Sequence, residues 1–429
     1  MKPHTSWYRQ HRVSNWLRYR TWPFPLAGII LGIAALRLLR VVDEHTTLSW
    51  FNYGEEGARS LASTLSAAML TLIVFVFSIL LLVVQLASAQ LTPRVIPKTF
   101  NDRTLKFTLS IMAFAFAYSV GVLARVDDRV PELCMAVAAS TSVLCLMAFF
   151  MLIDRVGKLL RPGTILAEVA TDGWRVIQQV YPELLSESLR DELRVETLDA
   201  PQRIVRASQK SGVLQGFHLE ELKRLAVVYD GVIELMPRVG DFVPPQSPLL
   251  RLSHAFSEIT DEQFRRCIAL GVERTIEQDP AFSLRILVDI ANKALSPAIN
   301  DPTTAVLALD QLHFLLREIG QRHLNPDVVL DDAGQMRLLY RTPNWADFVA
   351  LATMEIRQFG AQSIQVLRRL RAMLDDLVAS LPATRHAALE EERRLLEMTT
   401  AQSFVDVDER RIAEVSDTQG IGATPPSRL

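Results

Sequence analysis

The stretch that decides the fold runs from Ser60 to Pro93 and reads SLASTLSAAMLTLIVFVFSILLLVVQLASAQLTP. It holds no charged residue, and a helix needs roughly 20 apolar residues to cross a bilayer. Small and polar residues nevertheless recur along it at intervals of three, four and seven, which places them on one face of a helix. This polar stripe comprises Ser60, Thr64, Ala67, Thr71, Ser78, Gln85 and Ser88.

Two interpretations of the polar stripe follow from the chemistry of a helix in lipid. Small residues and hydroxyl groups allow helices to approach closely and to hydrogen-bond across their interface, so the stripe can be a helix-packing face. Several copies of the same helix could instead surround a water-filled path, with the stripe lining the pore. Gln85 favours the second interpretation slightly, because an amide in hydrocarbon requires polar partners.

Three further apolar runs are long enough to cross a membrane. With the opening stretch they predict transmembrane helices over about residues 22–42, 60–90, 105–124 and 133–153. The first run is not typical of a cleaved signal peptide, because it is long and is interrupted by Arg37 and Arg40. We therefore expect a transmembrane domain over residues 22–154, which contacts the lipid bilayer.

Lys and Arg predict the orientation of these spans, since they accumulate in cytoplasmic flanks. The basic arm of residues 1–21, the loop after the second span and the exit of the fourth are rich in cations, whereas the other two loops are acidic or short. The cations are Lys2, Arg9, Arg12, Arg18, Arg20, Arg94, Lys98, Arg103, Lys106, Arg155, Lys158 and Arg161. The pattern predicts a multi-pass plasma (inner) membrane protein with both termini in the cytoplasm.

The remainder of the chain has the composition of a soluble protein. We expect a helix followed by a small β module over residues 155–259 and a helical domain over residues 260–404. We expect a disordered tail over residues 405–429. The predicted fold class is a mainly α membrane protein: four transmembrane helices, then an α+β cytoplasmic region with a small β module and a C-terminal helical bundle.

Two helix starts are readable in this soluble part. Thr260 begins a capping box, from which we expect a helix continuing through Cys267 and Val272. Asp301 followed by Pro302 predicts a second helix start, because Asp accepts hydrogen bonds from free backbone amides and proline fits the first turn.

The sequence around Asp301, SPAINDPTTA, gathers polar side chains at a helix N-terminus, where amide groups and the helix dipole favour an anion. Asp301 would itself occupy that position as the cap. A structural corner and a ligand- or ion-binding site therefore both remain open. The candidate residues are Lys293, Ser296, Asn300, Asp301, Thr303 and Thr304.

Two segments together carry a resemblance to a known family. GARSLASTLSAAMLTLIVFVFSILLLVVQLASAQLTPRV and LRILVDIANKALSPAINDPTTAVLALDQL resemble the bacterial predicted membrane protein family called domain of unknown function 2254. The resemblance covers nearly the whole chain. It implies several membrane helices at the N-terminal end, and it brings no activity with it.

Motifs and composition narrow the function. The sequence contains no HExxH, GxSxG, Walker or post-strand GxGxxG motif, and its three cysteines are too few and scattered for a zinc site. With a net charge of -2 and no basic stripe, nucleic acid is not an expected partner. We expect no enzyme, catalytic residue, metal or cofactor.

Two functions remain. The first is a homo-oligomeric channel or transport-type protein with a cytoplasmic regulatory domain, which accounts for the polar stripe through self-association and would act on an unidentified small ion or ligand. The alternative is a membrane-anchored sensor or scaffold with no permeation path.

Overall fold

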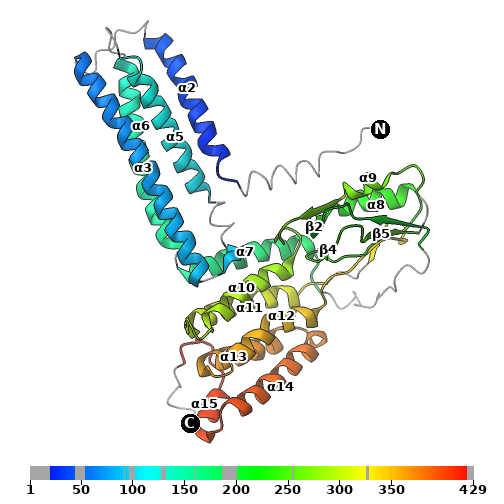
Figure 1. Ribbon diagram of the computed structural model, residues 1–429. Helices are drawn as coiled ribbons and strands as arrows, with labels where there is room; N and C mark the ends of the chain where they lie inside the picture. Colours follow the sequence, from blue (N-terminus) through cyan, green and yellow to red (C-terminus); the bar gives the residue numbers. More distant parts are fainter. Residues whose placement is uncertain are drawn as a thin grey trace. The chain divides into compact units, whose positions relative to one another are not determined.

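The computed structural model describes residues 20–43, 54–90, 92–95, 102–126, 132–159, 161–185, 201–253, 256–324 and 328–422. Over these residues the chain is mostly helical and forms two compact units, which divide between Thr164 and Ile165 (Figure 1). We call them the N-terminal unit and the C-terminal unit. The division lies further along the chain than the expected boundary at residue 154, because the fourth apolar helix continues to Leu159. The expected basic arm lies outside the described residues except for residues 20 and 21.

The N-terminal unit consists of long apolar helices that lie side by side (Figure 1). They are α2 (Pro23–Asp43), α3 (Glu55–Gln90), α5 (Arg103–Leu123) and α6 (Glu132–Leu159), with a 3-10 turn η1 (Pro93–Val95) after α3. All four helices are long and apolar enough to cross a membrane, which confirms four apolar helices at the N-terminal end of the chain. With 36 residues, α3 is about 54 Å long at 1.5 Å per residue, so it exceeds the thickness of bilayer hydrocarbon.

Two glycines allow α2 to pack closely on α5. A Cβ added at Gly28 would lie 2.2 Å from the carbonyl oxygen of Ser110, and one added at Gly32 would lie 2.8 Å from that of Phe114. Both distances are shorter than any real Cβ contact, so only glycine fits. Glycines four residues apart lie on one helix face and let two backbones approach, as in membrane helix pairs. Leu36, one turn further along, is buried on the same face.

Carboxylates fasten the ends of these helices to one another. Asp102 accepts hydrogen bonds from the backbone amides of Thr104 and Leu105, which makes it the N-cap of α5, and it also pairs with Arg155 of α6 at 2.7 Å. At the opposite ends, Asp43 of α2 accepts from the amide of Leu133 at 3.0 Å. Amides in the first turn of a helix have no partner within the helix, so each carboxylate satisfies free donors.

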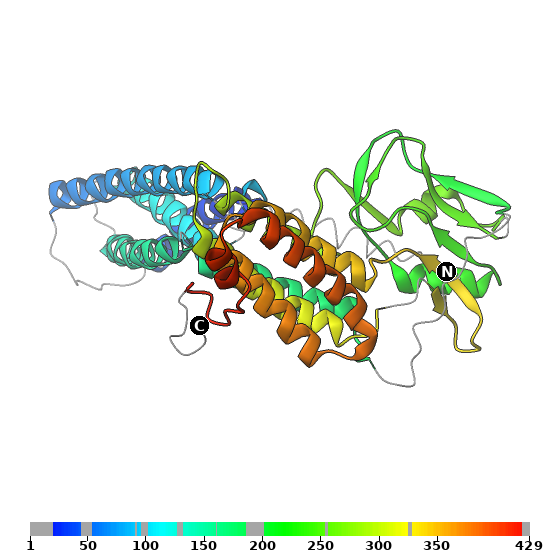
Figure 2. The ribbon, with the colours of Figure 1, turned by 90° about the horizontal axis from the view of Figure 1, so that it is seen from below.

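The C-terminal unit gathers its strands at one end and most of its helices at the other (Figures 1 and 2). The helices that pack together are α7 (Pro162–Val180), α10 (Pro280–Ala294), α11 (Pro302–Gly320), α12 (Trp345–Phe359), α13 (Ile364–Ser380), α14 (His386–Ser403) and α15 (Val407–Ala413), with a short 3-10 turn η2 (Ala383–Arg385). Their apolar faces form a continuous buried core, in which Leu309, Phe348 and Leu370 are fully enclosed.

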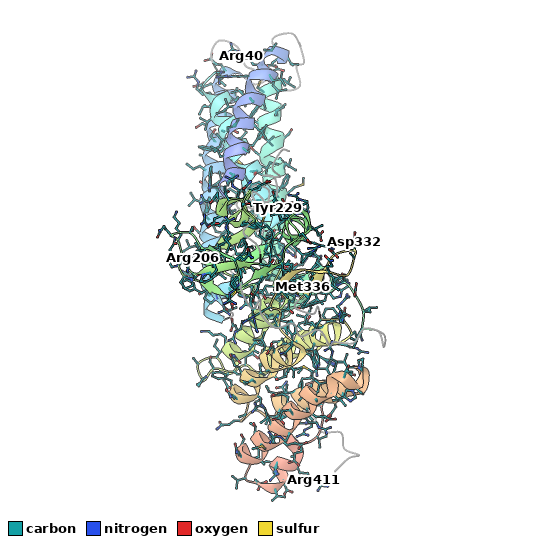
Figure 3. All side chains as sticks on the ribbon, turned by 90° about the vertical axis from the view of Figure 1, so that its right-hand side faces the viewer. Arg40, Arg206, Tyr229, Asp332, Met336 and Arg411 are labelled. Atoms are coloured by element: carbon teal, nitrogen blue, oxygen red, sulfur yellow. The ribbon has the colours of Figure 1, made fainter. Side chains whose placement is uncertain are left out.

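The strands form two sheets. A five-stranded sheet has the order β1-β5-β3-β8-β7, and a three-stranded sheet has the order β4-β2-β6. The strands are β1 (Arg203–Arg206), β2 (Gly212–Phe217), β3 (Ile233–Leu235), β4 (Phe242–Val243), β5 (Pro248–Leu252), β6 (Ile268–Gly271), β7 (Val328–Leu330) and β8 (Met336–Tyr340), accompanied by α8 (Leu219–Val228) and α9 (Asp261–Arg265). Asp332 lies in the turn between β7 and β8 (Figure 3).

The β module draws strands from both sides of the expected boundary at residue 260. β8 pairs in parallel with β3, Leu338 opposite Ile233, and such a pairing between distant segments leaves no trace in local periodicity. The helix expected through Cys267 and Val272 is wrong: α9 ends at Arg265, and Ile268–Gly271 is a strand paired with β2. The capping box at Thr260 is present.

The tail expected to be disordered from residue 405 is ordered as far as residue 422. Asp406 caps α15 by accepting from the amides of Asp408 and Glu409, and the segment after α15 is held by buried polar groups of α13. Composition alone predicts disorder here because the segment has few apolar residues. Its order comes from hydrogen bonds that the sequence pattern does not reveal. Residues 423–429 lie outside the described residues.

Candidate functional site

The polar stripe lies on the face of α3 that points away from α5 and α6. Six of its members are exposed, and Ser88 is half-buried. The buried apolar residues of α3, which pack toward α5 and α6, form a different set: Ala58, Ala62, Met69, Val76, Leu80, Val83 and Ala87. At 3.6 residues per turn these two sets lie on opposite sides of the helix. Packing of α3 on α5 and α6 therefore does not explain the stripe.

The hydroxyl groups of the stripe bond to their own helix. Thr64 donates to the carbonyl oxygen of Ser60 at 2.9 Å, Thr71 to that of Ala67 at 2.9 Å, and Ser78 to that of Val74 at 3.0 Å. This back-bonding satisfies the hydroxyl donor and leaves the oxygen able to accept. The side-chain amide of Gln85 is larger, carries two donors and one acceptor, and lies exposed on the same face.

Large apolar side chains border the stripe on both sides. The exposed ones are Leu70, Val74, Phe75, Phe77, Leu81, Leu82 and Leu86. Phe75 also contacts Phe149 of α6, with ring centroids 5.9 Å apart. The exposed face of α3 thus carries the narrow polar stripe between apolar side chains. The apolar side chains suit contact with hydrocarbon, and the polar stripe suits contact with water or with other polar groups.

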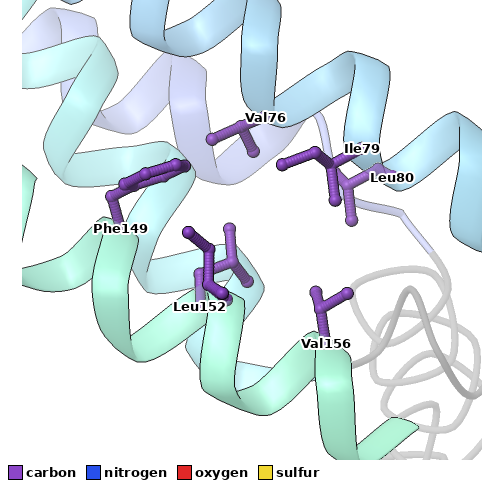
Figure 4. Close-up of a pocket in the computed structure, with 7 residues that line it drawn as sticks. Val76, Ile79, Leu80, Phe149, Leu152 and Val156 are labelled. Carbon is purple, nitrogen blue, oxygen red and sulfur yellow. The ribbon is translucent and has the colours of Figure 1, made fainter. Parts of the chain in front are cut away.

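A groove between α3 and α6 lies on another side of α3 (Figure 4). It encloses about 210 Å³, including its open side, and is lined only by apolar side chains: Val76, Ile79, Leu80, Phe149, Leu152, Ile153 and Val156. Because no lining side chain carries a polar group, the groove offers nothing that could recognise an ion or a polar substrate. We do not treat it as the functional site.

The SPAINDPTTA corner joins α10 to α11. Asp301 is the N-cap of α11: its carboxylate accepts from the amide of Thr304 at 3.1 Å and from the hydroxyl of Thr304 at 2.5 Å. The Ser296 hydroxyl donates to the carbonyl oxygen of Lys293 at 2.7 Å, and Asn300 adopts a left-handed conformation with φ of 51°. The Lys293 and Thr303 side chains are exposed. The polar groups at the centre of the corner are thus engaged with the chain itself.

One polar network near the corner is centred on Glu355, a residue that the sequence analysis did not single out. Arg285 of α10 pairs with Asp289 on its own helix and with both carboxylate oxygens of Glu355 on α12, at 2.5 and 2.8 Å. Asn292 also donates to Glu355, at 2.5 Å. The hydrogen bond to Glu355 raises the pKa of the Arg285 guanidinium. The four-residue spacing of Arg285 and Asp289 signals their pair, whereas nothing local to Glu355 signals its partners.

The thiols and possible metal ligands can be examined in the part of the chain that the structure describes. Its cysteines are all buried, and burial raises the pKa of Cys267 to about 12, so this thiol stays protonated and unreactive. Within the same residues, no group of three His, Cys, Asp or Glu side chains could hold a metal ion.

Four long apolar helices, followed in the chain by a second unit of helices and strands, are typical of a membrane protein. A family model described as "Predicted membrane protein (DUF2254)" matches residues 18–376, and the chain belongs to this family. The family resemblance of the two quoted segments is thereby confirmed.

Curated relatives come from mycobacteria. The chain is similar to the uncharacterized proteins Rv1290c of Mycobacterium tuberculosis and Mb1321c of Mycobacterium bovis, with 27% identity over 446 aligned residues that cover 98% of this chain and 85% of each relative. No solved structure matches the chain.

Proposed function

We propose that this protein is a homo-oligomeric channel or transport-type protein, in which the polar strips of α3 from several copies face one another around a permeation path. The C-terminal unit is then a regulatory domain in the cytoplasm, and both termini lie on that side of the plasma membrane. The permeating species is a small ion or a small polar ligand.

The observation that carries this proposal is the direction of the polar stripe. In lipid, an outward face of a single bundle meets hydrocarbon, which cannot hydrogen-bond to the amide of Gln85 or to the free acceptor sites of Thr71 and Ser78. Contact with a second copy, or with water held between copies, satisfies these groups. The small residues of the stripe also permit close approach between helices.

The orientation is supported by charge. Among the described residues, Arg94, Arg103, Lys106, Arg155, Lys158 and Arg161 all belong to the same end of the apolar helices, the end of α3 and α6 and the start of α5. Cations concentrate on the cytoplasmic side of membrane proteins, so this end of the helices, and the C-terminal unit that follows α6, are assigned to the cytoplasm.

Single cysteines on α3 test the assembly. In a background without the three native cysteines, we expect Thr71→Cys and Ser78→Cys to form disulfide-linked dimers on mild oxidation in membranes. Met69→Cys and Val76→Cys, which lie on the buried face, are the matched controls and should remain monomeric. Linkage at the controls, or none at the stripe, would sink the proposed interface.

A scaffold with no permeation path is the second candidate, and the back-bonded hydroxyls favour it, because they lower the cost of a dry interface. The same cysteines separate the two functions. A water-filled path makes the thiols at Thr71 and Ser78 react with small hydrophilic reagents, because thiolates form only in water, and makes Ser78→Asp alter ion flux in vesicles. Disulfide linkage without either effect would identify the scaffold.

A further inference from the structure

A histidine between two helices of the C-terminal unit has a protonation state fixed by its neighbours. His313 of α11 contacts Asp376 of α13 through Nε2 at 2.8 Å, and Arg369 of α13 through Nδ1 at 3.2 Å. A guanidinium can only donate hydrogen bonds, so Nδ1 accepts from Arg369 and Nε2 carries the proton that is donated to Asp376. His313 is therefore neutral in this arrangement.

Arg369 connects this histidine to the segment after α15. Its Nε donates to Asp310 of α11 at 2.7 Å, and its side chain is only 7% exposed. A Cβ added at Gly420 would lie 3.3 Å from the Cδ of Arg369 and 2.5 Å from a methyl of Val306, so the chain at Gly420 lies directly against both side chains. A displacement of Arg369 would therefore disturb the packing of the chain at Gly420.

The segment Val415–Gly422, which we call the clasp, is held mainly by hydrogen bonds. Asp417 accepts from the amides of Gln419, Gly420 and Gly422 at 2.8–3.1 Å. From α13, Arg368 donates to the carbonyl oxygens of Val415 and Gly422, each at 3.0 Å, and Gln365 donates to that of Gly420 at 2.6 Å. Ile421 is 64% exposed. With little apolar burial of its own, the clasp depends on the side chains of α13.

Burial and two neighbouring arginines oppose a second proton on the ring of His313, and Asp376 favours it. Burial lowers the pKa of His313; the hydrogen bond to Asp376 opposes this shift, and the charges of Arg369 and Arg317 add to it. On α11 the neighbouring charges are Asp310 and Arg317, on α13 they are Arg369 and Asp376, and on the clasp the charge is Asp417, which is engaged by backbone amides. A proton on Nδ1 would set an N–H against the guanidinium of Arg369.

We propose that the contact between α11 and α13 at His313 is a pH-sensitive latch, in which protonation of the imidazole displaces Arg369 and releases the clasp from α13. The proposal does not depend on a permeation path. Release uncovers Val306 and the buried Arg368, which the clasp covers, and so changes the surface that the C-terminal unit presents.

The direction of the effect follows from linkage. Since the pKa of His313 is lowered while the latch is closed, the closed state is fully favoured above the ordinary histidine pKa of about 6.5 and loses stability as the pH falls below it. A single proton shifts the equilibrium between closed and released clasp by at most about tenfold per pH unit.

Hydrogen exchange of the full chain in lipid nanodiscs tests the latch, at about pH 7.5 and about pH 5.5 with exchange times scaled for the intrinsic rate. We expect the amides of Gly420 and Gly422 to lose protection at the lower pH by up to about tenfold, because only the one unit below the ordinary histidine pKa of about 6.5 contributes. His313→Gln, which can donate and accept but cannot titrate, should abolish this pH dependence. His386→Gln, at a histidine that contacts the carbonyl oxygen of Leu381, should keep it.

A second variant guards against a misfolded His313→Gln. Asp376 favours the charged imidazole, so Asp376→Asn should extend the loss of protection to lower pH, while its onset stays near the ordinary histidine pKa of about 6.5. Unchanged protection of the clasp between the two pH values in the native chain overturns the latch. The same loss of protection in the native chain and in His313→Gln, or a loss that Asp376→Asn does not extend to lower pH, overturns it equally.

Discussion

The two units of this protein differ in the polar side chains that lie along their packed helices. In the N-terminal unit, Ser66, Thr71 and Ser142 each donate to a carbonyl oxygen four residues earlier in the same helix. In the C-terminal unit, Arg357 reaches Glu392 and Arg285 reaches Glu355, both on another helix. Hydrocarbon penalises every unsatisfied group, so a membrane helix satisfies its own. In the C-terminal unit, long charged side chains join helices that pack together.

Helix packing has a different origin in each of the two units. α2 and α5 fit together through missing side chains at Gly28 and Gly32, a matter of shape. α12 and α14 fit together around a buried ion pair as well as an apolar core. Removing a charge should therefore damage the C-terminal unit most, and adding volume should damage the N-terminal unit most.

The largest effect is expected for Glu392→Ala. The carboxylate lies 2.7 Å from Arg357, and both side chains are about nine-tenths buried. Losing one member leaves a buried, unpaired charge, which typically costs about 3–5 kcal/mol of unfolding free energy. Chemical denaturation followed by tryptophan fluorescence measures it. The double variant Arg357→Met/Glu392→Leu should recover most of the loss; if it does not, the ion pair is not the cause.

A smaller loss, of about 1–3 kcal/mol, is expected for Gly28→Leu, which forces extra volume against the backbone of α5. Thermal unfolding in detergent would show the loss. Gly157→Leu in α6 is the matched control, because no atom lies within 4 Å of a Cβ added there. Equal melting temperatures for the two variants would contradict close packing of α2 on α5.

The smallest effect is expected for Asp301→Ala, since its hydrogen bonds are local to one helix end. Loss of an N-cap costs about 1 kcal/mol and at most about 2. The melting temperature of the full chain should fall slightly and be restored largely by Asp301→Ser, which also caps helices. If both variants melt like the native chain but abolish a ligand response, the corner is a binding site and not a structural one.

The sequence predicts the membrane part well because apolar length and helical period are local properties. The four apolar helices follow from run length, and the stripe follows from the spacing of Thr64, Thr71 and Ser78. Which side of α3 the stripe faces does not follow, since apolar residues fill the rest of the helix. The four-residue spacing of Gly28 and Gly32 is a readable signal for the contact of α2 with α5.

The candidate sites of the C-terminal unit are less predictable because their partners are distant. Asp301 is readable as a cap from the Asp-Pro pair alone. Glu355 and Asp376 receive their partners from helices far away in sequence, and no local pattern identifies such pairs. Gly420 looks like part of a disordered tail until Arg368 and Asp417 are seen to hold the backbone around it.

The parallel pairing of β3 with β8 has a consequence for biosynthesis. β3 lies between β5 and β8 in the sheet. Its pairing with β8 forms only after Leu338, the partner of Ile233, has been synthesised 105 residues later. At about 5–20 residues per second, one side of β3 stays open for roughly 5–20 s after it leaves the ribosome. An open strand edge can pair with the wrong chain. During this time the nascent sheet is most vulnerable to mispairing with other molecules that are being made on the same messenger.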